Sequence, residues 1–146
     1  MIKEDKNIFL YIKAHPNFSK KKPIENQLKK LESSNVKYLS NSLEVDSINL
    51  LKNSDVVVTF GSTIELVAKY LNKKTIPMFK QLYSGLGIFK YPKNEKSLKS
   101  MIYKKQNIKK GSIDTLFKIG YFLMTFGINY KFFKSSSFFR GNLVEE

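Results

Sequence analysis

Several residue types are missing or rare in this chain, and each absence excludes a kind of chemistry. No cysteine occurs among the 146 residues, which excludes disulfide bonds, thiolate nucleophiles and thiolate metal ligands. Histidine occurs once, as His15, and carboxylates are few, so we expect no metal site built by the chain. Arginine also occurs once, as Arg140, so the bidentate fork that reads bases and phosphates is nearly absent.

A long hydrophobic run is missing as well. The most apolar stretch, Ile119 to Ile128, has about ten residues, whereas a membrane-spanning helix needs roughly twenty. The first six residues, MIKEDK, carry charges of both signs, which does not fit a secretory signal. These features predict a cytoplasmic protein and leave open a peripheral contact with the inner face of the membrane.

Lysine is what the chain has in excess. The 26 basic residues face 12 acidic ones, which gives a net charge of +14. Such a surface attracts polyanions as a diffuse field, and nucleic acid, anionic lipid and phosphorylated small molecules all fit it. Hydrophobic residues make up 42% of the chain, which indicates a folded domain with a core.

Strand and helix patterns alternate over the first two-thirds of the chain. Strands are predicted at 8–12, 36–39, 55–60 and 75–79, and helices at 23–31, 46–52, 62–72 and 95–105. This alternation predicts an α/β fold, with a Rossmann-like parallel sheet and helices on both faces, over residues 1–110. Residues 111–146 are predicted to form a helix at 112–125 and a basic, aromatic tail that packs on that domain.

The sharpest local feature is the turn after the third predicted strand. The run 55–60 is β-branched throughout, which predicts a strand buried on both faces. Gly61 ends it, and Ser62 and Thr63 open a helix whose free backbone N–H groups could bind phosphate. A purely structural interpretation competes with this one, since Ser62 to Glu65 also fits a capping box that needs no ligand.

Two other features carry possible chemistry. His15 follows the first predicted strand and would face the same crevice as Ser62, where it could bind a phosphate oxygen. On its own, a surface-loop histidine is the commoner case. The aromatic and basic segment 117–139 fits single-stranded nucleic acid, an anionic membrane surface, or simple core packing of a helix.

Taken in order, these segments resemble the C-terminal domain of GT-B-fold glycosyltransferases that build bacterial capsules and surface polysaccharides. The likeness rests on YIKAHPN at 11–17, on SDVVVTFGST at 54–63, on Tyr91-Pro92, and on the closing segment 120–131. It covers most of the chain.

This resemblance implies a donor site for a nucleotide-activated sugar. His15, Ser62 and Thr63 would hold its phosphates, with Gly61 in the turn and Tyr83 at the crevice wall. His15 would also act in catalysis by stabilising the departing nucleotide. No metal and no cofactor are implied, and the sugar would pass by direct displacement to a glycan or lipid-linked acceptor.

The sequence departs from the family in three ways. Val67 stands where the family usually has a glutamate, and Glu65 lies about 200° away on a helix, so it cannot simply substitute. The usual Gly-Lys-Pro after the helix is here Asn72-Lys73-Lys74. The chain also begins near the family domain's second strand, so we expect a fragment, a decayed copy, or a subunit completed by a separate N-terminal domain or a homodimer.

Two other functions stay open on the sequence. One is a non-catalytic module that binds a membrane surface or a glycan through its basic face and aromatic tail. The other is a nucleic-acid-binding protein, which is the least favoured because arginine is nearly absent and no known nucleic-acid motif occurs.

Overall fold

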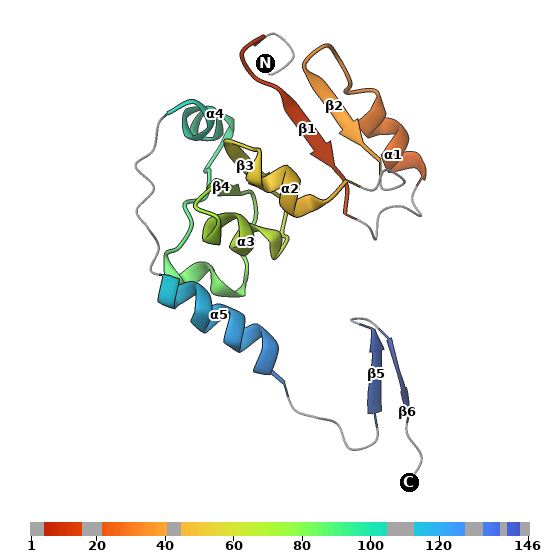
Figure 1. Ribbon diagram of the computed structural model, residues 1–146, viewed down its shortest axis with the longest axis vertical. Coiled ribbons are helices and arrows are strands. Elements are labelled where there is room, and N and C mark those ends of the chain that lie inside the picture. The colour runs from red at the N-terminus through yellow and green to blue at the C-terminus, as the bar shows by residue number, and fades with distance from the viewer. Residues whose placement is uncertain are drawn as a thin grey trace. The chain divides into compact units, whose positions relative to one another are not determined.

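The computed structural model describes residues 5–15, 22–40, 45–104, 113–127, 133–137 and 140–143. The chain is a mixed α/β protein that divides into two compact units, Met1–Asp55 and Val56–Glu146 (Figure 1). The predicted α/β class is therefore confirmed. The predicted continuous Rossmann-like sheet is not shown, because each unit contains its own parallel pair of strands.

The first unit is built on the parallel strands β1 (Leu10–Lys13) and β2 (Val36–Leu39). The crossover between them contains α1 (Lys22–Lys29), which packs on β2. Val36 and Tyr38 alternate along β2 and are buried, as expected for a strand with one face in a core. The predicted strands at 8–12 and 36–39 are thus confirmed.

A short helix, α2 (Ser47–Lys52), closes this unit. The Asp46 side chain caps it by accepting a hydrogen bond from the N–H of Ile48 at 2.8 Å, as the sequence predicts. Leu51 is the residue of α2 that lies buried.

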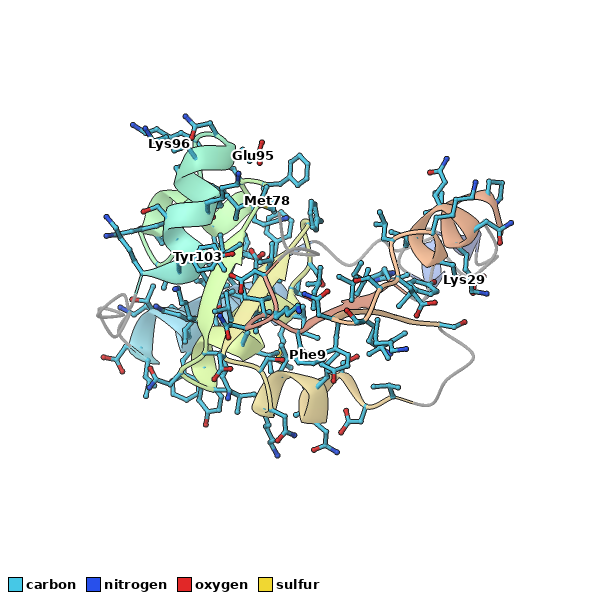
Figure 2. All side chains as sticks on the ribbon, turned by 90° about the horizontal axis from the view of Figure 1, so that it is seen from above. Phe9, Lys29, Met78, Glu95, Lys96 and Tyr103 are labelled. Atoms are coloured by element: carbon cyan, nitrogen blue, oxygen red, sulfur yellow. The ribbon has the colours of Figure 1, made fainter. Side chains whose placement is uncertain are left out.

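The second unit begins with the parallel strands β3 (Val56–Thr59) and β4 (Lys74–Pro77), joined by α3 (Ile64–Tyr70). The helix α3 packs on both strands and also contacts α5 (Ile113–Thr125). After β4 and before α5 in the chain come the 3₁₀ helix η3 (Leu82–Leu86) and the helix α4 (Glu95–Tyr103). Figure 2 labels Glu95 and Tyr103, the two ends of α4. These elements match the helices predicted at 62–72, 95–105 and 112–125.

The core of this unit gathers side chains from η3, the segment after it and α5. Tyr83, Ile88, Phe89 and Ile119 are buried together, with Leu66, Tyr91 and Leu116 packed against them. The helix α5 is therefore anchored through Leu116 and Ile119, which share one of its faces.

One prediction about β3 is wrong. Its apolar run predicts burial on both faces, but Val58 is 36% exposed and only Thr59 is buried within the strand. The physical reason is that β3 has a single strand neighbour, β4, in the described part of the chain. A β-branched run therefore marks a strand here without marking the centre of a sheet.

The C-terminal segment contains a hairpin that the sequence does not predict. The strands β5 (Phe133–Ser137) and β6 (Arg140–Leu143) pair antiparallel, with an irregular register near Ser135. The tail aromatics Tyr130, Phe132, Phe138 and Phe139 fall outside the described residues. The packing of this tail on the preceding domain, and the boundary at residue 110, stay predictions.

Candidate functional site

The turn from β3 into α3 is shaped by Gly61. This residue has a φ of +72°, in the left-handed region that favours glycine. A Cβ atom at this position would lie only 2.9 Å from the Nε2 atom of Gln81. The backbone angle therefore favours glycine between Phe60 and Ser62, and a larger residue would also displace the amide end of the Gln81 side chain.

This turn lies at the carboxyl edge of the β3–β4 pair. The N–H of Met78, which directly follows β4 and is labelled in Figure 2, donates to the carbonyl of Thr59 at 2.8 Å. The segments after β3 and after β4 therefore leave the pair side by side. In parallel sheets, ligands bind beyond this edge of the strands.

The predicted capping box is not formed. Thr63 occupies the N-cap position of α3 and its side chain makes no capping hydrogen bond. The Ser62 hydroxyl accepts only a long hydrogen bond, 3.4 Å, from the N–H of Ile64. Glu65 does not reach back to Ser62, because its side chain turns into the core.

Glu65 instead links three elements beneath the turn. Its carboxylate accepts a 2.6 Å hydrogen bond from the Thr59 hydroxyl at the end of β3 and a 2.7 Å bond from the Tyr83 hydroxyl in η3. Glu65 is 0% exposed. Its Oε2 atom accepts the bond from Thr59, and its Oε1 atom accepts the bond from Tyr83. A buried carboxylate is costly unless it is hydrogen-bonded, so these two donors hold Glu65 in place.

Tyr83 thus contributes to the site indirectly, through its hydrogen bond to Glu65. It is buried, and both burial and its hydrogen bond to Glu65 raise the pKa of its hydroxyl above the usual tyrosine range. Its hydroxyl supports the turn through Glu65, and its predicted contact with a ligand at the crevice wall stays a prediction.

Ser62 and Thr63 bring polar groups to the start of α3. Thr63 is exposed and Ser62 is half-buried. Among the described residues, the amide groups of Ser62 and Thr63 donate no hydrogen bond. Two hydroxyls and two amide donors are therefore available at the start of α3, and such a set can coordinate an oxyanion.

Beside the turn, the structure places an aromatic pair that the sequence analysis missed. The rings of Phe60 and Phe79 lie 6.2 Å apart at a tilt of 53°, and they are 71% and 60% exposed. Phe60 directly follows β3, and Phe79 lies two residues beyond the end of β4, so both lie at the carboxyl edge. The only sequence signal was their position, since phenylalanine after a buried strand is more commonly a core residue.

His15 lies in the other unit. It is exposed and sits two residues beyond β1, at the carboxyl end of that strand, as the sequence predicts. Its neighbours Pro16 and Asn17 fall outside the described residues. Because His15 and Ser62 belong to separate units, their convergence on one ligand stays a prediction.

Val67 and Glu65 lie on different faces of α3. Val67 is 37% exposed, whereas Glu65 is fully buried. Glu65 therefore does not take the place of Val67 on the exposed side of the helix, as the predicted rotation of about 200° between them implies.

No helix in the described ranges combines the length and apolar character needed to cross a membrane. Those ranges also contain no cluster of three or more metal-ligating side chains. Comparisons with protein-family models, with curated proteins and with solved structures find no match to this chain.

Proposed function

We propose that this chain binds a nucleotide-activated sugar and acts as the donor-binding part of a glycosyltransferase of surface-polysaccharide synthesis. The observation that carries the proposal is the β3–α3 turn after Gly61, where the amides of Ser62 and Thr63 donate no hydrogen bond to any described residue and two hydroxyls lie at the start of α3. The charge of the chain adds support, because a net +14 favours a phosphorylated ligand.

The division of roles follows from the chemistry of transfer. An acceptor hydroxyl oxygen attacks the anomeric carbon, the bond from that carbon to the nucleotide's phosphate oxygen breaks, and a base takes the acceptor proton. Ser62 and Thr63 would hold the phosphates, and His15 would offset the negative charge on the departing nucleotide.

The base is not supplied by the residues around the turn. Glu65 is the nearest carboxylate in sequence, and it is buried with both oxygens occupied by Thr59 and Tyr83. A general base must reach the proton that it removes. The proposed activity of this chain is therefore donor binding, with the base provided elsewhere in the functional enzyme.

The exposed aromatic pair fits the rest of such a ligand. A nucleobase or a sugar ring can stack on an exposed aromatic face, and Phe60 and Phe79 lie at the same edge as the turn.

A calorimetric titration tests the proposal. The protein is titrated with CDP, UDP and pyrophosphate, beside a double variant, Ser62→Ala with Thr63→Ala. We expect saturable binding that weakens by roughly tenfold or more in the variant, because two hydrogen bonds to a charged group are lost.

The matched control is Thr75→Ala, which removes a hydroxyl near the amino end of β4, where it bonds to the carbonyl of Lys73. It should bind as the wild type does. A folded wild-type protein that binds none of the three compounds would refute the proposed function.

A further inference from the structure

The helix α5 has a second apolar face that the core does not use. Its outward stripe consists of Ile113, Phe117, Tyr121 and Met124, which are 55%, 62%, 72% and 89% exposed. Their spacing of four, four and three residues places them along one side of the helix. The inward face of α5 packs on the core through Leu116 and Ile119.

The stripe continues onto the neighbouring helix. Tyr70 of α3 is 57% exposed, and its ring meets that of Phe117 edge-on at 6.3 Å. The resulting surface, called here the α5 stripe, comprises Tyr70, Ile113, Phe117, Tyr121 and Met124. Exposed apolar side chains gathered on one side of a helix are a common feature of interaction sites.

The sequence around α5 is rich in positive charge. Between residues 104 and 134 the only acidic residue is Asp114, and lysines occur at 104, 105, 109, 110, 118, 131 and 134. An aromatic helix within a lysine-rich segment has the two components of interfacial membrane binding, which are apolar insertion and attraction to anionic lipid.

We propose that the α5 stripe docks onto an anionic membrane surface, with α5 lying in the interface. The charge pattern favours this partner over a second copy of the chain, because two copies at +14 repel each other. The mixture of aliphatic and aromatic side chains along one helix face favours lipid over stacked bases. The inference stands on the α5 stripe alone and does not depend on the proposed nucleotide site.

Vesicle flotation tests this inference directly. The full chain is mixed with vesicles of phosphatidylcholine alone, or of phosphatidylcholine with phosphatidylglycerol. We expect the protein to float only with the anionic vesicles, and added salt to weaken that binding because it screens the lysines. The double variant Phe117→Ser with Tyr121→Ser should bind the anionic vesicles roughly tenfold or more weakly, because two inserted side chains are lost.

One control variant and one charge variant accompany this experiment. The control is Phe9→Ser, which removes an aromatic side chain that is 65% exposed and lies outside the stripe, and it should leave vesicle binding unchanged. Lys109→Gln with Lys110→Gln should weaken binding to the anionic vesicles at low salt. Circular dichroism shows whether each variant keeps its helices.

Three results would overturn the inference. The first is a folded wild-type protein that does not float with anionic vesicles. The second is equal vesicle binding by wild type and the stripe variant. The third is a dimer in solution that the stripe variant converts to monomer, because a second copy would then cover the surface.

Discussion

The carboxylate of Glu65 is the residue on which the geometry of the candidate site depends. It joins the end of β3, the first turn of α3 and η3 through two short hydrogen bonds, both made in a fully buried position. Because such a group cannot turn to water when a partner is lost, its donors matter more to stability than exposed polar contacts do. The two hydrogen bonds of Glu65 therefore fix the position of the turn formed by Gly61 to Thr63.

The variant Tyr83→Phe measures this support. It deletes the hydroxyl that donates to Glu65 and leaves one buried carboxylate oxygen without that partner. We expect the free energy of unfolding to fall by about 1–3 kcal/mol, measured by urea denaturation. Tyr121→Phe is the control, because Tyr121 is 72% exposed, and it should unfold at the wild-type urea concentration. Equal unfolding midpoints for the two variants would contradict the role given to Glu65.

Because of the Tyr83 hydroxyl, we also expect the stability of the fold to depend on pH. Burial and the bond to Glu65 raise the pKa of Tyr83, so the folded state holds this proton more tightly than the unfolded state does. Stability from this group is present below the unfolded tyrosine pKa of about 10 and is lost as pH rises through the folded value. In a spectrophotometric titration, Tyr83→Phe should remove an ionisation step that lies above the usual tyrosine range. Loss of an ordinary-range step instead would contradict the assignment.

At the scale of elements, the β3–Gly61–α3 unit shows how much of this site the sequence could predict. The strand, the glycine turn and the helix follow from local patterns, and all three are found. The partner of Glu65 does not follow, because Tyr83 lies 18 residues away and only the folded chain brings the two together. The sequence from Ser62 to Glu65 also fits a capping box. The structure excludes it, because the Glu65 side chain is buried and hydrogen-bonded to Thr59 and Tyr83.

Two glycine variants test the turn. Gly61→Ala places a Cβ in the left-handed region and against Gln81, so we expect a loss of about 1–3 kcal/mol of stability. Gly85→Ala in η3 is the matched control, since its Cβ would meet no atom within 4 Å. Thermal denaturation of both variants measures the difference. A Gly61→Ala protein as stable as Gly85→Ala would show that the turn tolerates a side chain.

At the scale of the whole molecule, the parallel pairs β1–β2 and β3–β4 agree with the sequence, whereas the single sheet predicted from them is not shown. Periodicity marks each strand, and a short crossover makes consecutive strands parallel neighbours. Periodicity does not determine whether two strand pairs join into one sheet, because that depends on contacts between residues far apart in the sequence. The exposed Val58 illustrates this limit, since its β-branched run suits an inner strand equally well.

Binding of a nucleotide phosphate at the β3–α3 turn is the step on which the proposed function depends. Backbone amide NMR signals, followed while UDP is added, measure it most directly. We expect the amide signals of Gly61, Ser62 and Thr63 to shift together and to saturate with one shared affinity. Unchanged signals from these three amides at millimolar UDP, in a protein that remains folded, would contradict a donor site at this turn.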